Sequence, residues 1–185
     1  MNIFVLCTGR CGSTTFIRAC QHISNFSSTH ESLSGKLGEQ RFSYPERHIE
    51  ADNRLSWLLG RLDMCYGKRA FYVHLLRDME KTARSFTKRA DRGIMKAYQD
   101  PGILMKLPKN SDPMKVAYDY IHTVTSNIEM FLRDKPLQMR FDLESANQLF
   151  PMFCERISAQ VDLLGALGEF AIHHNASPVD DVSAK

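Results

Sequence analysis

Short apolar runs alternate along the chain with longer stretches that have helical character. Residues 3–7 (IFVLC) and 70–76 (AFYVHLL) are continuous apolar segments, and residues 137–141 are a weaker third one. Runs of this length are typical of strands that are buried on both faces of a parallel sheet. Residues 25–50 predict a long polar loop, with one short strand near residues 27–30.

Helices are expected between and after these strands. The five predicted segments are residues 14–24, 53–66, 79–90, 113–135 and 145–168. Asp112 is expected to cap the fourth helix, with Pro113 at its first position, and Pro151 is expected to break the fifth. Strands that alternate with helices predict a three-layer α/β/α fold with a mostly parallel sheet.

The composition supports one folded domain and excludes several classes of protein. The chain has 185 residues, 43% of them hydrophobic, so we expect a single domain over residues 1–175 and a flexible tail over residues 176–185. No segment approaches the roughly 18 consecutive apolar residues of a transmembrane helix, and residues 3–7 are too short for a signal peptide. A cytoplasmic protein without a membrane partner is expected. The net charge of +3 favours a small anionic ligand over nucleic acid.

The five cysteines are odd in number and scattered along the chain: Cys7, Cys11, Cys20, Cys65 and Cys154. This usage argues against a disulfide framework and is typical of a reducing cytosol. A zinc site at Cys7 and Cys11 would need a second pair of cysteine or histidine ligands, which the sequence does not offer. No metal is therefore expected.

The glycine turn that follows residues 3–7 is the first segment with a chemical pattern. Gly9 and Gly12 allow the backbone to approach an anion, and the amide groups at the start of the next helix favour negative charge. Arg10 can donate a fork of hydrogen bonds to phosphate oxygens. The predicted anion cradle comprises Gly9, Arg10, Cys11, Gly12, Ser13 and Thr14. A plain strand–turn–helix connection without a ligand is the alternative.

Two well-known phosphate loops do not fit this turn. The nucleoside-triphosphatase loop G-x-x-x-x-G-K-[ST] requires a lysine after its second glycine, and here Ser13 follows Gly12. The cysteine phosphatase loop requires an arginine six residues after its cysteine. Ser13 stands there for Cys7 and Ile17 for Cys11.

A second basic position follows the strand predicted at residues 70–76. Arg77 ends this strand, and ligands of open α/β sheets bind where parallel strands end. Ser85 lies eight residues later, about two turns along the next helix, so its hydroxyl can reach the same anion. A solvated arginine and a surface serine are the alternative. His74, within the same apolar strand, is interpreted as a hydrogen-bonded core histidine.

Together the two motifs resemble those of the sulfotransferases. The 5′-phosphosulfate loop of that family has a strand, a basic residue, a small residue, glycine and two hydroxyl residues, which residues 10–14 match. Its 3′-phosphate motif has a strand end, an arginine and an aspartate, then a serine eight positions after the arginine and an aromatic residue. The matching residues here are Arg77, Asp78, Ser85 and Phe86. The resemblance covers roughly residues 1–90.

The resemblance implies a P-loop domain, similar in fold to the nucleoside triphosphatases, that acts as a sulfotransferase. It implies transfer of a sulfonate from 3′-phosphoadenosine 5′-phosphosulfate (PAPS) to a hydroxyl or amine of a small-molecule or glycan-type acceptor. Arg10 and the loop amides would stabilise the transferring group. Glu31 is the preferred general base and His30 the second. A homodimer is possible.

Two other functions stay open at this point. A small kinase-like P-loop enzyme would need a loop lysine and a magnesium-binding acid at a strand end, and a non-catalytic module of the same fold would bind an anion without transfer. Many sulfotransferases also close the donor site with a G-x-x-G-x-x-K segment, which this sequence lacks after residue 150. The sequence does not identify the acceptor.

Overall fold

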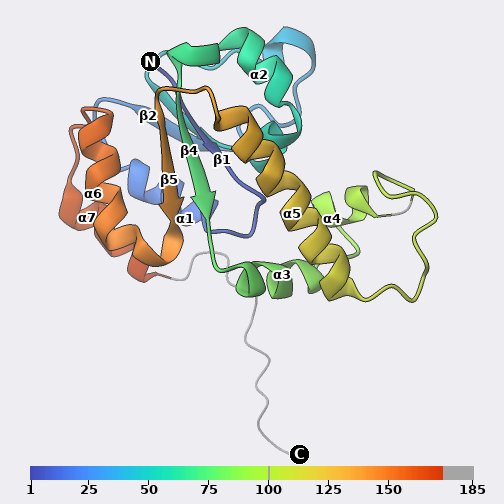
Figure 1. Cartoon of the computed structure of the whole chain (residues 1–185). Coiled ribbons are helices and arrows are strands. Elements are labelled where there is room, and N and C mark those ends of the chain that lie inside the picture. Colours follow the sequence, from blue (N-terminus) through green and yellow to red (C-terminus); the bar gives the residue numbers. More distant parts are fainter. Residues whose placement is uncertain (100, 173–185) are drawn as a thin grey trace, which may run out of the picture.

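Five strands of the described chain, which covers residues 1–99 and 101–172, pair in one sheet of order β2-β3-β1-β4-β5 (Figure 1). In this computed structural model every pair is parallel, so the carboxyl ends of all five strands lie at one edge. The strands are β1 (Ile3–Leu6), β2 (Ser27–His30), β3 (His48–Ala51), β4 (Phe71–Leu76) and β5 (Gln138–Asp142). The tail predicted over residues 176–185 lies outside the described residues.

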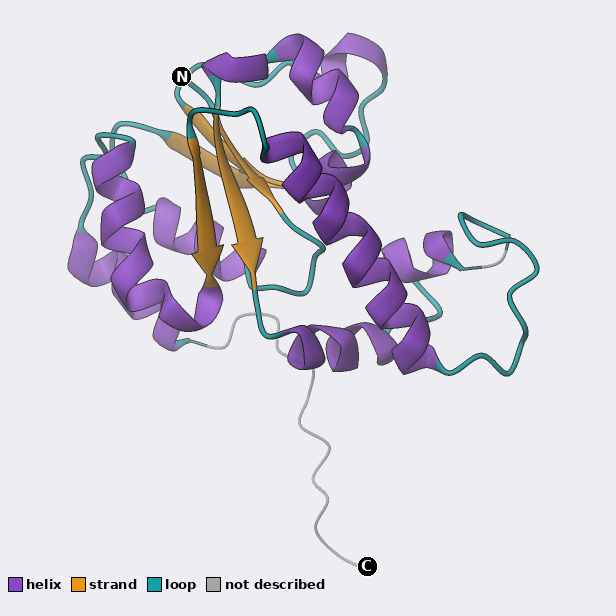
Figure 2. Ribbon diagram, viewed as in Figure 1, coloured by secondary structure: helices purple, strands orange, loops and turns teal. Residues whose placement is uncertain are grey.

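Helices cover both faces of the sheet, as Figure 2 shows. Three lie on one face: α1 (Ser13–Cys20), α6 (Ala146–Arg156) and α7 (Leu163–Ala171). Four lie on the other side: α2 (Leu59–Cys65), α3 (Met79–Thr87), α4 (Gly93–Tyr98) and α5 (Pro113–Leu132). Short 3-10 helices link them: η1 (Gly38–Phe42), η2 (Asn53–Trp57), η3 (Gly67–Arg69) and η4 (Leu143–Ser145). This confirms the predicted α/β/α fold class.

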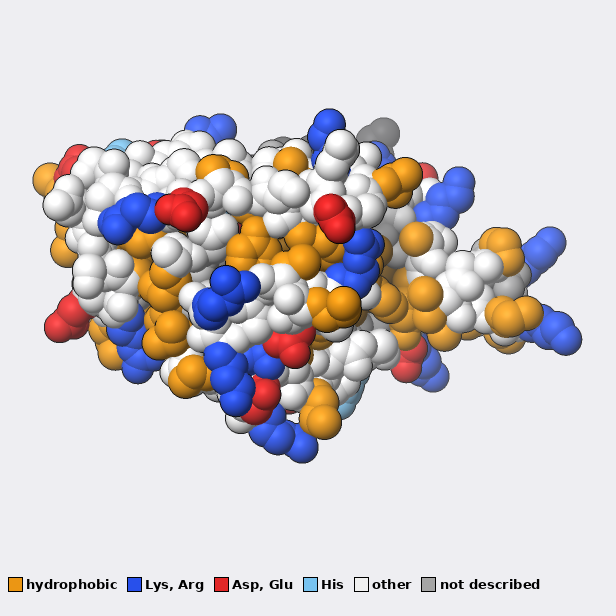
Figure 3. Space-filling view, turned by 90° about the horizontal axis from the view of Figure 1, so that it is seen from above, with side chains coloured by type: hydrophobic (Ala, Val, Ile, Leu, Met, Phe, Trp, Pro, Cys, Tyr) orange, Lys and Arg blue, Asp and Glu red, His pale blue; other side chains and the backbone are white. Residues whose placement is uncertain are grey.

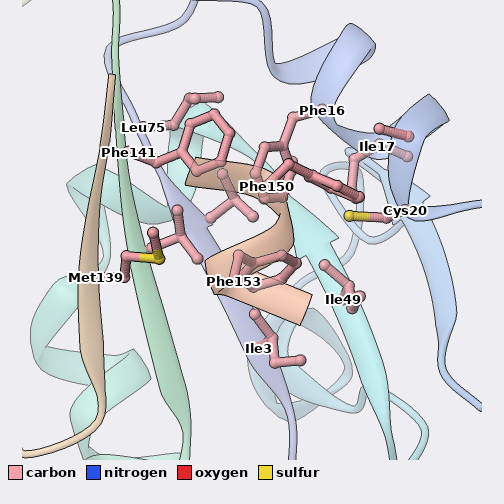
Figure 4. Packing of buried hydrophobic residues seen from close by; sticks show 14 of the residues in the cluster. Ile3, Phe16, Ile17, Cys20, Ile49, Leu75, Met139, Phe141, Phe150 and Phe153 are labelled. Atoms are coloured by element: carbon pink, nitrogen blue, oxygen red, sulfur yellow. The ribbon is translucent and has the colours of Figure 1, made fainter. Parts of the chain in front are cut away.

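The strands contribute alternate residues to two hydrophobic cores, one on each face of the sheet, because successive side chains of a strand point to opposite faces. Val5 packs on the side of α1, whereas Phe4 packs on the side of α5. In the first core the rings of Phe16 and Phe141 meet edge to face, 4.9 Å between centroids (Figure 4). Burial of one such ring stabilises the fold by about 1.5–3 kcal/mol. This packing fixes α1, and the loop before it, against the sheet.

The strands β1 and β4 are neighbours at the centre of the sheet, but their outgoing connections run in opposite directions. The chain leaves β1 through α1 to reach β2 at one edge, and it leaves β4 through α3, α4 and α5 to reach β5 at the other. Open α/β sheets bind ligands in the crevice outside the carboxyl ends of two such strands. The segments after Leu6 and Leu76 therefore meet at the position that is typical of a binding site.

The strand β3 corrects the prediction of a loop that extends to residue 50. Ile49 and Ala51 face a hydrophobic core, but they alternate with the polar residues His48 and Glu50. The sequence of β3 therefore does not resemble that of a buried strand. Both polar side chains are nevertheless buried and lie 3.1 Å apart. Thr29 of β2 also donates a hydrogen bond to Glu50 at 2.6 Å. Mutual hydrogen bonding offsets the burial of these groups.

Two helix predictions are wrong in detail. Pro151 does not break the last helix, because the burial of Phe150 and Phe153 on either side outweighs the backbone hydrogen bond that proline removes. The chain turns instead at Ser158, which has a φ of 54°, and α7 follows. The helix predicted over residues 53–66 is the 3-10 helix η2 followed by α2.

The position of His74 agrees only in part with its interpretation as a hydrogen-bonded core histidine. The residue is 5% exposed, so it does belong to the interior of β4. Its Nε2 atom, however, has no hydrogen-bond partner among the described residues. Burial lowers the pKa of His74 to about 4, and the neighbouring charge of Arg140 acts in the same direction. The ring is therefore neutral near pH 7.

The side of the molecule at the amino ends of the strands has a surface of mixed charge. In the view of Figure 3, from above, positive and negative side chains are interspersed, and the segment between α4 and α5 projects from the body. This segment exposes Ile103 and Met105. Among the described residues, none of the helices combines the length and the apolar character that crossing a membrane requires.

Candidate functional site

The loop between β1 and α1 has a backbone shape that requires its glycines. Gly9, Arg10 and Gly12 all have positive φ angles, of 85°, 58° and 87°. A Cβ atom at Gly9 would lie 2.9 Å from Nδ2 of Asn53, and one at Gly12 would lie 2.6 Å from a methyl group of Leu143. Both positions therefore exclude larger residues by conformation and by space.

The start of α1 can receive an anion. Gly12 occupies the N-cap position and has no side chain with which to cap the helix. The first amide groups of a helix have no partner within the helix and carry a partial positive charge. The hydroxyl groups of Ser13 and Thr14 stand at the same turn. The structure thus places the predicted cradle, residues 9–14, at the carboxyl edge of the sheet.

Side chains from two other elements form hydrogen bonds to the backbone at the start of this loop. The hydroxyl of Tyr120 on α5 donates to the carbonyl oxygen of Thr8 at 2.7 Å. Burial raises the pKa of Tyr120, so it remains a hydroxyl donor at neutral pH. Ser56 of η2 accepts from the amide of Cys7 and donates to its carbonyl oxygen, at 3.3 and 3.0 Å. These contacts fix the loop against the rest of the fold.

Cys7 and Cys11 lie inside the fold rather than in the site. Both side chains are buried, at most 1% exposed, and they hydrogen-bond to each other. This contact raises the pKa of Cys7, which burial raises further, and lowers the pKa of Cys11. Cys11, one of the predicted cradle residues, can therefore bind a ligand only through its backbone amide. Within the described chain, no group of three or more side chains is arranged to hold a metal ion.

The second motif meets the first through two hydrogen bonds. Arg77 donates from Nη1 to the backbone carbonyl oxygen of Arg10 at 3.2 Å. Arg10 donates from Nε to the hydroxyl oxygen of Ser85 at 2.9 Å. Arg77 and Ser85 are 67 and 75 residues away from Arg10 in sequence. The loop after β1 is thus hydrogen-bonded both to Arg77 at the end of β4 and to Ser85 of α3.

Arginine side chains bring positive charge to this site. Burial lowers the pKa of Arg10, and the charges of Arg89 and then Arg77 lower it further. Like charges that gather in a half-buried place favour the binding of an anion. Asp78, next to Arg77, caps α3 by accepting from the amide of Lys81 at 2.8 Å, so this carboxylate serves the helix.

His30 and Glu31, the two candidate bases, lie at the end of β2 and have different partners. Nε2 of His30 lies 2.9 Å from the hydroxyl oxygen of Ser13. Glu31 has a positive φ of 53°, and its carboxylate forms an ion pair with Nη1 of Arg54 at 2.9 Å. The structure therefore brings His30 into contact with the predicted cradle, residues 9–14, which we call the anion loop, whereas Glu31 contacts the start of η2.

The buried carboxylate of Glu50, close to these residues, was not predicted from the sequence. Glu50 accepts hydrogen bonds from the amide and hydroxyl of Ser32, at 2.8 and 2.7 Å, in addition to the bond from Thr29. Burial alone would raise the pKa of Glu50, but the hydrogen bonds from His48, Thr29 and Ser32 outweigh it and lower the pKa. The network holds the segment after His30 in place. The alternation of polar and apolar residues in β3 (HIEA) is the signal that could have revealed it.

Comparison with known proteins supports the fold. No protein-family model matches the sequence, and no curated protein matches it. The solved sulfotransferase domain from the curacin biosynthetic pathway is similar, with a TM-score of 0.66 and 14% identity, over 90% of this chain and 76% of that one. Mouse sulfotransferase SULT7A1, complexed with PAP, has a TM-score of 0.53 and 14% identity, over 95% of this chain and 60% of that one. This chain thus spans about three fifths of SULT7A1. The fold is sulfotransferase-like.

Proposed function

We propose that this protein is a sulfotransferase that moves a sulfonate group from PAPS to a hydroxyl or amine of an acceptor. The observation that carries the proposal is the contact of Arg10 with both Arg77 and Ser85 beside a glycine loop. PAPS has an anionic group at each end of its ribose. The loop amides would bind the 5′-phosphosulfate, while Arg77 and Ser85 would bind the 3′-phosphate. The likeness to a sulfotransferase complexed with PAP supports this assignment.

The residues present fit the chemistry of this transfer. The acceptor oxygen or nitrogen would attack sulfur, the bond from sulfur to the phosphate oxygen would break, and adenosine 3′,5′-bisphosphate (PAP) would leave. Arg10 and the amides at the start of α1 would stabilise the charge that gathers on the transferring and leaving groups. The acceptor proton would pass to a base at the end of β2. The contact between His30 and Ser13 supports His30 in this role, and Glu31 is the alternative.

The proposal is tested by calorimetry with PAP and with 5′-AMP, which lacks the 3′-phosphate. We expect the intact chain to bind PAP at least about tenfold more tightly, because the additional phosphate gains charge-assisted hydrogen bonds. Arg77→Ala should abolish this preference. Arg84→Ala is the matched control, since Arg84 lies on the exposed face of α3 and pairs with Glu80. Equal affinity of the unaltered protein for the two nucleotides would contradict the proposal.

Transfer itself is measured with labelled PAPS and a panel of hydroxyl and amine acceptors. A labelled acceptor product supports the sulfotransferase assignment. Binding of PAP without transfer to any acceptor would support the non-catalytic module instead. Tighter binding of ATP than of PAP, dependent on magnesium, would support a kinase-like enzyme.

A further inference from the structure

The end of α3 carries an arginine on the same side as Ser85. Beyond Thr87 the chain makes one more turn, in which the amide of Arg89 donates to the carbonyl oxygen of Phe86 at 2.9 Å. Arg89 therefore follows Ser85 by four residues, a spacing that places two side chains on one face of a helical segment. Ser85 is the residue that accepts the hydrogen bond from Arg10. This spacing places Arg89 on the face that carries Ser85, which is the face toward Arg10.

The electrostatics of Arg10 agree with this placement of Arg89. Its positive charge acts on Arg10 more strongly than that of Arg77 does, although Arg77 contacts the backbone of Arg10. Arg89 is half-buried. Among residues 1–99 and 101–172, neither Arg77 nor Arg89 forms an ion pair with an acidic side chain. The guanidinium group of Arg10 thus contacts Ser85, and Arg77 and Arg89 add two further positive charges that act on Arg10.

We infer that Arg89, together with Arg77 and Ser85, binds the 3′-phosphate of the donor and sets the preference for 3′-phosphorylated nucleotides. The inference rests on the proposed function. Guanidinium groups that lie close together repel each other unless an anion lies between them, and a doubly charged phosphate offers three acceptor oxygens for their forked donors. Arg89 supplies a cation from the end of α3, where the family motif, which ends at Phe86, predicts none.

The test compares Arg89→Ala with the unaltered protein in calorimetric titrations with PAP and with 5′-AMP. We expect Arg89→Ala to weaken PAP binding about 10- to 100-fold and to change 5′-AMP binding less than about twofold. Arg89→Lys should recover part of the loss, because lysine supplies the charge without the fork. Arg92→Ala is the matched control, because Arg92 is exposed and lies beside Asp91. Thermal unfolding checks that each variant is folded.

The outcomes separate this inference from the proposed function. If the unaltered protein does not distinguish PAP from 5′-AMP, the proposed function itself fails. If it does distinguish them and Arg89→Ala keeps the same ratio of affinities, the role of Arg89 is refuted while the function stands. A loss that is equal for both nucleotides would also refute it, because Arg89 would then act on the 5′ end or on the fold. Selective loss of PAP binding supports it.

Discussion

The hydroxyl oxygen of Ser13 lies 2.9 Å from Nε2 of His30, although the two residues belong to different elements. Ser13 begins α1, and His30 ends β2 at the same edge of the sheet. The contact therefore joins the anion loop to a titratable side chain. Glu31, the next residue, has its carboxylate on Arg54 instead. This difference in partners distinguishes the two candidate bases.

We expect His30→Gln to lower kcat by about 10²- to 10⁴-fold, the usual contribution of a general base, and Glu31→Gln to lower it less. The physical reason is that a base must reach the acceptor proton at the loop that holds the donor. The measurement is the initial rate with labelled PAPS and an acceptor found by screening, as a function of pH. Loss of the acid limb of the profile in His30→Gln identifies the base.

Glu39→Gln serves as the control for this pair, because Glu39 is an exposed residue of η1. All three variants should bind PAP with similar affinity, since none of these side chains is assigned to the nucleotide. If Glu31→Gln loses more activity than His30→Gln, the order expected from the sequence holds and the contact with Ser13 is structural.

Gly12→Ala should destabilise the protein more than Gly38→Ala does and should abolish nucleotide binding. Both glycines have positive φ angles, so each alanine costs about 1–2 kcal/mol of backbone strain. At Gly12 the new methyl group would also meet Leu143 at 2.6 Å, whereas nothing lies within 4 Å at Gly38. Thermal unfolding should show a difference of a few degrees, at about 2–4 °C for each kcal/mol in a chain of this size. Equal melting temperatures would show that Leu143 yields freely.

The sequence contains enough local signal to predict the centre of the fold. The strands β1 and β4 are continuous apolar runs, and Asp112 caps α5 as expected, accepting from the amide of Met114 at 2.8 Å. The two motifs could be found because each follows such a strand: the glycine turn begins at Gly9, just after the apolar run 3–7, and Arg77 comes directly after the run 70–76. Parallel pairing of these strands then brings them together. The fold class follows from the same alternation.

Other features could not be predicted because they depend on contacts between distant segments. β3 is buried but polar at every second position, and the hydrogen bonds that satisfy Glu50 come from His48 and from Thr29 of β2. Tyr120 contacts Thr8 across 112 residues, and no local pattern marks it. Arg89 belongs to a charged helix end that resembles an ordinary solvated surface until its effect on Arg10 is known. Such features become visible only in the three-dimensional structure.

Glu50→Gln should destabilise the fold at neutral pH and lose its effect in acid. The carboxylate is fully buried and accepts hydrogen bonds from Ser32 and Thr29. A glutamine amide would place its own N–H donor opposite one of these donors. The hydrogen bond lost there lowers the free energy of unfolding by about 1–3 kcal/mol. Because the pKa of Glu50 is lowered below 4.5, its contribution is present above that pH and lost as the pH falls through the folded-state value.

The measurement for Glu50 is urea unfolding from pH 7 to pH 3. The gap between the unaltered protein and Glu50→Gln should narrow below about pH 4.5, with the slope in urea unchanged. Glu46→Gln, at an exposed position of the same chain segment, should show no gap at any pH. A gap of constant size down to pH 3 would mean that packing, and not charge, accounts for the loss.

His74→Leu should raise stability at mildly acidic pH. In the folded state burial lowers the pKa of His74 to about 4, whereas in the unfolded chain it is near 6.5. Between these values the unfolded chain binds a proton that the folded protein rejects, so stability falls as the pH falls, by up to about 3 kcal/mol. Leucine removes this loss, and it also removes the Nε2 atom that has no partner in the described part of the chain.

The free energy of unfolding of His74→Leu, measured from pH 7 to pH 4, should therefore depend on pH less steeply than that of the unaltered protein. At pH 7 the two proteins should differ by no more than about 1–2 kcal/mol, because both side chains are then neutral and of similar size. His122→Leu is the control, since His122 lies on an exposed part of α5. If His74→Leu and the unaltered protein lose stability in parallel down to pH 4, His74 accepts its proton in the folded state, which its burial in β4 opposes.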